Sequence, residues 1–299
     1  MDVLDQVVTE QYAIYHGDCV DVCRGLPDAS VDYSVFSPPF ASLYTYSNSP
    51  RDMGNVRDHA EFFAHFDYLI AELRRVIKPG HLVSFHCMQL PTSKERDGYI
   101  GLTDFRGDLI RAFQRHGWIY ASEVAIWKNP VTAMQRTKAL GLLYKTVRSN
   151  ATMSRQGIAD YVVTMRDPRE VEDRVAHGDE YPVSLWQKIA SPIWMDINPS
   201  DTLQYRSARE HEDERHIAPL QLEVIRRCIR LWTKRGDVVL SPFAGIGSEG
   251  YVAIEEGRRF VGIELKGSYY RQAVANLAMV GSSYQMGLFK PADPEAKAP

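Results

Sequence analysis

The sequence of residues 237–265, DVVLSPFAGIGSEGYVAIEEGRRFVGIEL, decides the fold of this chain. Its apolar start predicts a buried strand, its glycines a tight turn, and the remainder a helix and a second strand. Within it, GIGSEG (245–250) matches the pattern GxGxxG in the strand-to-helix context that a nucleotide-binding turn requires. Glu264 ends the second strand, where a carboxylate can accept hydrogen bonds from both hydroxyls of a ribose. An adenosine-containing cofactor is therefore expected, although Gly245 and Gly247 would also suit a turn that binds nothing.

The glycine turn lies late in the chain. An ordinary dinucleotide-binding sheet begins with its glycine turn, but only about fifty of the 299 residues follow this one, too few to complete such a sheet. We therefore expect the other strands to come from the N-terminal half, in a circularly permuted, doubly wound, mainly parallel Rossmann-like α/β sheet. This order argues against an NAD or FAD oxidoreductase, whose cofactor-binding half continues through further strands.

The N-terminal half contains the required alternation of strands and helices. Short apolar runs bounded by turn residues predict strands at 12–16, 31–36, 82–88 and 118–129. Apolar positions three and four residues apart predict helices at 58–77 and 104–116, and a later helix with Pro219 in its first turn. This alternation is typical of a parallel sheet covered by helices.

The composition excludes several classes of protein. No run approaches the roughly 18 consecutive apolar residues of a membrane span, and the N-terminus is too acidic and polar for a signal peptide, so we expect a cytoplasmic protein. The four cysteines, Cys19, Cys23, Cys87 and Cys228, form no CxxC pair, and no histidines cluster at metal-ligand spacing. We expect reduced thiols in the core and no metal site.

A second unusual stretch is VDYSVFSPPF (31–40), in which a predicted strand ends at Ser37, Pro38, Pro39 and Phe40. Two adjacent prolines remove two backbone donors and fix two φ angles, so the chain forms a rigid corner there. Taken alone, this corner would also suit a strand-ending turn with a core phenylalanine.

Four short stretches together resemble a known family. They are GDC (17–19), SPPF (37–40), FAGIGSEG (243–250) and GIEL (262–265), and they resemble the motifs of S-adenosylmethionine-dependent DNA amino-methyltransferases. Their order along the chain is similar to that of the β class, in which the catalytic corner comes early and the cofactor glycines come last.

The resemblance implies a division of the chain. It covers about 20–128 and 216–277, and we expect a catalytic methyltransferase domain of 1–128 and 216–285 with one sheet built from both segments. An inserted target-recognition region would occupy 129–215. The polar, Pro-rich tail of 286–299 is expected to be disordered. Double-stranded DNA is the implied partner, and a homodimer is expected by analogy only.

The chemistry of the family gives the corner a function. The exocyclic amine of adenine or cytosine is a poor nucleophile because its lone pair is delocalised into the ring. The resemblance implies that the Ser37 side chain and the Pro38 carbonyl accept the two amine N–H groups, while Pro38 and Pro39 hold that carbonyl still. Phe40 would stack on the base, which has to be turned out of the duplex to reach the pocket.

The resemblance also implies S-adenosyl-L-methionine as the cofactor. The loop at 243–247 would wrap its methionine part, Glu264 would bind the ribose, and Asp18 would lie near the adenine amino group. Asp18 would also suit a turn after a glycine. The match at 216–221 is looser, because the family more often has a Lys-Pro or Arg-Pro pair, and His216 could instead cap a helix. The expected cofactor-binding residues are Asp18, Cys19, His216, Gln221, Ser241, Phe243, Ala244, Gly245, Gly247 and Glu264.

The target base is less clearly indicated. In the family, DPPY generally accompanies adenine-N6 and SPPY accompanies cytosine-N4, and SPPF matches neither. The serine favours cytosine, whereas Phe40 and the likeness to solitary, phage-type enzymes favour adenine-N6, which we take as the first expectation, with cytosine-N4 as the alternative.

A local basic surface inside 129–215 is the candidate DNA groove. From Lys128 to Arg169 the chain has eight basic residues and two acidic ones, although its net charge is −3. Solvated loops would show the same excess of positive charge. With the loop at 41–58, the candidate DNA contacts are Tyr44, Tyr46, Arg51, Lys128, Arg136, Lys138, Arg148, Asn150 and Arg155.

Other classes of protein share parts of the pattern. An RNA or protein amino-methyltransferase can carry a Pro-Pro-aromatic corner, usually without the permuted order. An FAD or NAD oxidoreductase would explain GIGSEG and Glu264 but leaves SPPF unexplained. An inactive DNA-binding relative would not need both an intact glycine loop and an intact corner.

Overall fold

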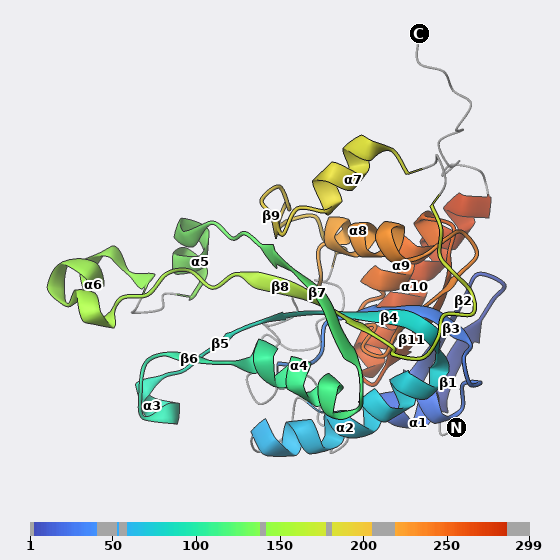
Figure 1. The fold of residues 1–299 in the computed structure, drawn as a ribbon, viewed down its shortest axis with the longest axis horizontal. Helices are drawn as coiled ribbons and strands as arrows, with labels where there is room; N and C mark the ends of the chain where they lie inside the picture. The colour runs from blue at the N-terminus through green and yellow to red at the C-terminus, as the bar shows by residue number, and fades with distance from the viewer. Residues whose placement is uncertain are drawn as a thin grey trace, which may run out of the picture.

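The computed structural model describes residues 3–40, 53, 59–137, 142–177, 181–204 and 219–285, which build a nine-stranded sheet with helices on both faces (Figure 1). Its strands are β1 (Val3–Val8), β2 (Tyr12–Gly17), β3 (Val31–Phe36), β4 (Ile77–Met88), β7 (Ile119–Ile126), β8 (Asp160–Arg166), β9 (Ile193–Trp194), β10 (Val238–Ser241) and β11 (Arg259–Glu264). Their order in the sheet is β1-β2-β11-β10-β3-β4-β8-β7-β9.

The centre of the sheet is parallel. Strands β2, β11, β10, β3 and β4 all run in one direction, while β1 is antiparallel to β2 and β8 is antiparallel to both β4 and β7. The carboxyl ends of the parallel strands therefore share one edge of the sheet, which is where open α/β sheets bind ligands. The predicted α/β class with a mainly parallel sheet is confirmed.

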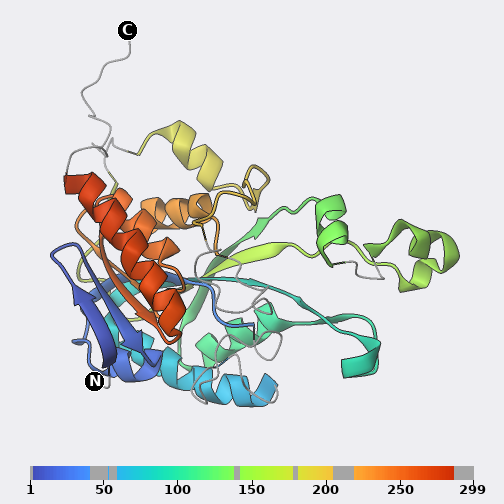
Figure 2. The same cartoon turned by 180° about the vertical axis from the view of Figure 1, so that it is seen from behind.

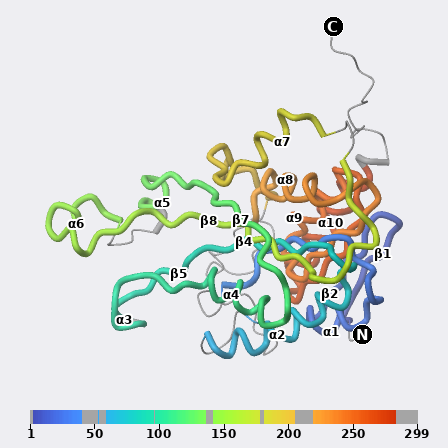
Figure 3. Tube along the Cα trace, in the orientation of Figure 1, coloured from blue at the N-terminus to red at the C-terminus, as the bar shows by residue number. Residues whose placement is uncertain are grey.

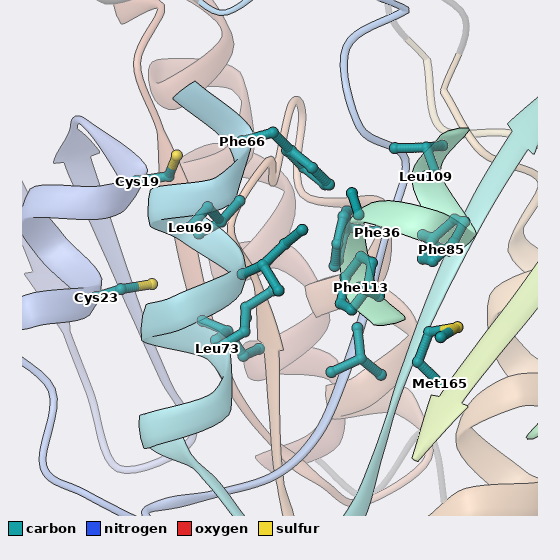
Figure 4. Packing of buried hydrophobic residues seen from close by; sticks show 14 of the residues in the cluster. Cys19, Cys23, Phe36, Phe66, Leu69, Leu73, Phe85, Leu109, Phe113 and Met165 are labelled. Atoms are coloured by element: carbon teal, nitrogen blue, oxygen red, sulfur yellow. The ribbon is translucent and has the colours of Figure 1, made fainter. Parts of the chain in front are cut away.

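Helices cover the two faces with separate apolar cores. On one face lie α1 (Cys19–Arg24), α2 (His59–Val76) and α4 (Phe105–Arg115), and on the other lie α8 (Leu222–Trp232), α9 (Ser248–Glu255) and α10 (Gly267–Gln285). Figure 4 shows the first core, where Leu69 and Phe66 of α2 point toward Phe36 and Phe113. The spacing of three and four residues that predicts α2 therefore places its apolar side chains on the sheet.

Two predictions about these elements need correction, and one strand has no counterpart among the predictions. Strands β8 and β9 come from within 129–215, so the sheet is not built from the two flanking segments alone. Strand β1 was not predicted, because most of its side chains are exposed and it lacks an apolar face. Helix α8 begins after Gln221, its N-cap, so Pro219 precedes the helix instead of lying in its first turn.

Two segments project from the carboxyl edge of the sheet. One, which we call the arm, comprises residues 130–137 and 142–157 between β7 and β8, with α5 (Pro130–Thr137), α6 (Tyr144–Ser149) and the short helix η4 (Ala151–Met153) (Figures 2 and 3). The other contains β5 (Leu90–Pro91), α3 (Lys94–Asp97) and β6 (Leu102–Thr103). Neither α6 nor η4 has a buried residue, so the arm has no core there.

All four cysteines are free and buried, as predicted. Among the described residues, no cluster of histidine, cysteine, aspartate or glutamate side chains could hold a metal ion.

One more helix, α7 (Val183–Ile189), lies between β8 and β9. Over the described parts of the chain, no helix combines the length and hydropathy needed to cross a bilayer.

Candidate active site

The proline corner and the glycine turn leave the sheet from neighbouring strands. Strand β10 pairs with β3, Leu240 opposite Ser34, and the Ser34 hydroxyl donates a hydrogen bond to the Leu240 carbonyl at 3.0 Å. Beyond the paired residues, the Phe36 and Phe243 rings pack with centroids 5.7 Å apart. Two motifs about 200 residues apart in sequence, 37–40 and 243–247, therefore lie side by side at the carboxyl edge.

The corner is held firmly on its buried side. Pro38 is buried, while Ser37, Pro39 and Phe40 are partly exposed. The Phe40 ring meets Phe105 of α4 edge to face, with centroids 6.2 Å apart. The Ser37 hydroxyl lies 3.1 Å from His86 Nδ1. The corner thus contains a hydroxyl, a proline carbonyl and an aromatic ring within four consecutive residues.

The two key glycines of the turn differ in their surroundings. Gly245 has φ +53°, and within the described parts of the chain a Cβ there would meet no atom within 4 Å. Gly247, the N-cap of α9, has φ +86°, and a Cβ would lie 3.3 Å from Ala273 Cβ. Both need the left-handed conformation, but only Gly245 borders open space, which leaves room for a ligand against its backbone.

Glu264 ties the glycine turn to the end of β11. Its Oε2 accepts a hydrogen bond from the Gly245 N–H at 2.9 Å, and its Oε1 accepts one from the Lys266 N–H at 2.7 Å. The Ala244 N–H also donates to the Ile263 carbonyl at 2.9 Å. The predicted ribose ligand is therefore oriented by backbone groups on both of its carboxylate oxygens.

The predicted residues near the adenine position have structural contacts of their own. Asp18 caps α1, accepting from the Val20 and Asp21 N–H groups at 3.0 Å. It also lines an open cavity of about 300 Å³ between α1 and α2. The Cys19 thiol packs into the core against α2 (Figure 4), and burial raises its pKa well above the usual value. Cys19 can thus offer a ligand only its backbone.

Two buried polar atoms among the predicted cofactor residues lack partners within the described structure. They are Ser241 Oγ, at the end of β10, and Gln221 Oε1, at the N-cap of α8. Burial of an unpaired hydroxyl or amide oxygen is costly, so such atoms suit a bound polar ligand. His216 lies outside the described residues.

The sequence matches the DNA methylase family of N6 and N4 methyltransferases over residues 31–275. The chain belongs to this family. The matched range includes the corner, the glycine turn and Glu264, the features that the fold brings to one edge.

Two Type II methyltransferases illustrate how the methylase relates to known proteins. M.Cfr9I of Citrobacter freundii is 26% identical over an alignment of 287 positions, gaps included, that covers 88% of this chain and 87% of M.Cfr9I. M.BglII of Bacillus subtilis is 25% identical over 258 residues, which are 86% of this chain and 66% of M.BglII.

Solved structures share the fold of the methylase. The Thermus thermophilus protein TTHA0409, complexed with S-adenosyl-L-methionine, has a TM-score of 0.69 at 22% identity, with 91% of this chain and 94% of that chain covered. PvuII DNA methyltransferase, described as cytosine-N4-specific, has a TM-score of 0.67 at 16% identity, with 96% and 97% covered.

Sequence reasoning missed three side chains beside the site of the methylase. His86 contacts the corner, and Asp160 lies next to His86. Glu249, in the first turn of α9, is buried, and this burial raises its pKa to about 8. The sequence does show an acidic residue directly after the glycine turn, in SEG (248–250). It does not show the partners of His86, because these depend on strand pairing.

The predicted DNA contacts of the methylase are only partly brought together. Arg148 and Asn150 are exposed on the arm, and Arg155 is partly buried there, donating to the Gln156 carbonyl at 3.0 Å. Lys128 instead pairs with the buried Asp160 at 2.5 Å. Tyr44, Tyr46, Arg51 and Lys138 lie outside the described residues, and the side chain of Arg136 is not described.

Part of the predicted basic surface lies elsewhere. Arg169 binds the buried Asp167 and donates to the carbonyls of Arg74 and Ile77, at the opposite edge of the sheet. Its role there is structural. The excess of positive charge counted along the sequence therefore overstates the basic character of the carboxyl edge.

Proposed function

We propose that this methylase transfers a methyl group from S-adenosyl-L-methionine to the exocyclic amine of a base in duplex DNA. The observation that carries the proposal is the adjacency of the corner and the glycine turn on paired strands β3 and β10. Methyl transfer requires donor and acceptor to meet in one place, and these two motifs are the ones expected to hold them.

The residues of the glycine turn fit this cofactor. Gly245 leaves space against its backbone, Glu264 is oriented beside it, and Ser241 Oγ is a buried polar atom that finds no partner among the described residues. When bound, S-adenosyl-L-methionine supplies a methyl group on a positively charged sulfur. The likeness in fold to TTHA0409, solved with that molecule, supports the assignment.

The corner would prepare the amine for attack. Ser37 Oγ and the Pro38 carbonyl would accept its two N–H bonds, which favours a pyramidal nitrogen with a localised lone pair. Because two prolines fix the backbone, these acceptors need little reorganisation during the reaction. Phe40 would stack on the base after it leaves the duplex.

Three observations bear on the target base. The serine at position 37 favours cytosine-N4, and the chain shares its fold with an enzyme described as cytosine-N4-specific. Phe40 is the ground for expecting adenine-N6. We keep both products in the proposal, since the acceptors at the corner serve either amine.

The arm is the proposed DNA-binding element. It leaves the sheet after β7 and returns at β8, and its entry and exit lie at the same edge as the corner because Ile126 and Met88 both pair with Asp160. It exposes Tyr144 together with Lys145 and Arg148. Basic and aromatic side chains on one projecting element suit contacts with the DNA backbone and with bases.

We also propose that the protein is cytoplasmic and that it forms a homodimer.

The test is methyl transfer to DNA. Purified protein with labelled S-adenosyl-L-methionine should label bacterial duplex DNA, and Ser37→Ala should reduce the rate by about 10² to 10³. Gly245→Asp should abolish labelling by blocking the cofactor. Chromatography of the digested nucleosides then identifies N6-methyladenine or N4-methylcytosine.

Two control variants separate chemistry from folding. Ser282→Ala removes an exposed hydroxyl on α10, and Gly236→Asp places the same side chain at φ +83° in open space away from the site. Both should retain labelling. Labelling that survives Ser37→Ala and Gly245→Asp, or that requires RNA or protein as acceptor, would contradict the proposal.

A further inference from the structure

Four side chains form a continuous chain of polar contacts behind the corner. Ser37 Oγ lies 3.1 Å from His86 Nδ1, His86 Nε2 lies 3.2 Å from Asp160 Oδ2, and Asp160 Oδ1 lies 2.5 Å from Lys128 Nζ. In this conformation both contacts of Asp160 are close ion pairs without hydrogen-bond alignment: neither the His86 Nε2–H bond nor the Lys128 ammonium is well aligned with the carboxylate oxygen that it meets. Asp160 is almost fully buried, and only 12% of the His86 side chain is exposed.

Strand pairing explains why these residues meet. Phe36 of β3 lies opposite Phe85 of β4, so the next residues, Ser37 and His86, are also neighbours. On the other side of β4, Met88 lies opposite Asp160 of β8, which places Asp160 on the face of His86 two residues away. Strand β7 pairs with β8 at Ile126, and Lys128 follows two residues later.

A serine hydroxyl can donate one hydrogen bond and accept two, so its role toward an amine is ambiguous. If Ser37 donates its proton to His86 Nδ1, its lone pairs are left to accept from the amine. This requires the imidazole proton to be on Nε2. A carboxylate beside Nε2 favours that tautomer, as in other His–carboxylate pairs.

We infer that His86 is a positioning residue, held by Asp160 and Lys128, that keeps Ser37 as an acceptor and takes up through it the proton that the amine loses. The inference rests on the proposed function. As the amine nitrogen bonds to the methyl carbon, the carbon–sulfur bond breaks and its electron pair stays on sulfur. The amine proton passes to Ser37 Oγ while the Ser37 proton passes to His86 Nδ1, and the imidazolium then releases it to water.

The charges around His86 suit this role. Asp160 of β8 and Lys128 after β7 face the ring. The other charged side chains nearby act on the Cys87 thiol, which points to the opposite face of the sheet from His86; they are Arg106, Glu123 and Asp104. Burial opposes the charge of Asp160, but His86 and Lys128 more than offset it and lower the pKa of that carboxyl. A stable anion therefore remains beside the imidazole across neutral pH.

The first test is the pH dependence of single-turnover methyl transfer. When His86 is protonated, Nδ1 donates to Ser37 and the hydroxyl can no longer give up its proton, so the wild-type rate should fall on the acid side of its profile. His86→Asn keeps an acceptor near Nδ1 without titrating, so it should be slower by about tenfold but lose this acid-side fall. His86→Leu should lose about 10² to 10⁴ in rate.

Binding measurements distinguish this role from a structural one. Both variants should bind S-adenosyl-L-methionine and duplex DNA within about twofold of wild type, since His86 lies behind Ser37 on β4 and belongs neither to the predicted cofactor residues nor to the arm. A His86→Leu rate close to the wild-type rate, or a His86→Asn profile with the same acid-side fall, would overturn the inference.

The second test needs no substrate. Nitrogen NMR of the histidine-labelled protein should show His86 protonated on Nε2, with its Nδ1 signal changed by Ser37→Ala and its Nε2 signal changed by Asp160→Asn. Protonation on Nδ1 would refute the inference even if methylation is observed. If the wild type labels no DNA but the NMR result holds, the proposed function fails while the Ser37–His86–Asp160 arrangement stands.

Discussion

At the scale of the residue, Gly245, Gly247 and Gly236 form a natural comparison, because all three have positive φ. Alanine at any of them should cost about 1 to 2 kcal/mol of unfolding free energy through backbone strain. Gly247→Ala should cost more, since its Cβ would also press on Ala273 at 3.3 Å. Urea unfolding of the three variants measures this order, and equal losses would show that the contact with Ala273 is harmless.

The same three variants separate stability from cofactor binding. Gly245 borders the open space proposed for the cofactor, whereas Gly236 lies in a turn at the other end of β10. Gly245→Ala should therefore weaken S-adenosyl-L-methionine binding severalfold and Gly236→Ala should not. Isothermal titration of the folded variants provides the measurement.

Glu249 gives the stability of the protein a dependence on pH. Burial raises its pKa in the folded protein from 4.5 to about 8, so the folded state binds the proton more tightly than the unfolded state. The resulting stabilisation is complete below pH 4.5 and is lost as the pH rises through 8. Between pH 5.5 and 7.5 the wild type should lose about 2 to 3 kcal/mol relative to Glu249→Gln.

Denaturant unfolding of both proteins at the two pH values isolates this effect, because all other groups titrate equally in each. Glu255→Gln, on the same helix but in contact with solvent, is the matched control. A constant difference between wild type and Glu249→Gln at both pH values would contradict the assignment.

At the scale of the element, Arg227 anchors the segment before α8 to that helix. Its guanidinium is buried, pairs with Asp196 at 2.8 Å and Glu223 at 3.0 Å, and lies over the Trp194 ring at 5.1 Å. Hydrogen bonding to Arg227 is the main cause that lowers the pKa of Asp196 to about 2. A buried cation with two carboxylates is costly to disrupt from one side.

Arg227→Ala should therefore reduce the unfolding free energy by about 3 kcal/mol, since it removes a buried guanidinium that packs over Trp194 and bonds two partly exposed carboxylates. Lys188 contacts the same two carboxylates from the surface, and Lys188→Ala should cost less than about 1 kcal/mol. Thermal unfolding of the two variants tests the difference. Equal losses in the two variants would mean that the burial of Arg227 adds nothing to the free energy of unfolding.

Elements with a strong local pattern could be predicted from the sequence. The apolar run 31–36 has the bounds of β3, and the helical spacing after residue 58 matches α2. Strand β8 was missed because VVTM is short and lies among basic and polar residues, so nothing local distinguishes it from a loop. Its place in the sheet is decided by pairing with β4 and β7, which the sequence pattern does not contain.

The candidate site likewise has parts that the sequence predicts and parts that it does not. The corner and the glycine turn are continuous motifs, and the order of the motifs along the chain was enough to expect them together. His86, Asp160 and Lys128 come from three different strands or their ends, and they meet only through register. The sequence alone therefore predicts a DNA contact at Lys128, because its buried partner Asp160 is evident only from the strand pairing.

At the scale of the whole molecule, the position of the arm predicts how DNA binding responds to mutation and salt. Arg148 is exposed, so Arg148→Ala should leave folding and cofactor affinity unchanged. If it contacts a phosphate, DNA affinity should fall and the slope of log K against log salt should decrease by about 0.9. Fluorescence anisotropy with labelled duplex DNA at several salt concentrations measures both.

Arg115→Ala is the control, because Arg115 is also exposed but lies at the end of α4 that leads into the start of β7, away from the carboxyl edge. DNA affinity should not change in that variant. Equal losses from Arg148→Ala and Arg115→Ala would indicate a general charge effect, and the arm would then not be the DNA-binding element.

The strand order β2-β11-β10-β3 has a consequence for how the protein is made. The two strands synthesised early are separated in the sheet by the two synthesised late, so a growing polypeptide on the ribosome cannot close its central sheet until residues 238–264 have emerged. Until then β2 and β3 have open edges that invite association with other chains. Folding of the catalytic edge is therefore a late, cooperative event of long-range closure, and chaperone demand should be highest just before translation ends.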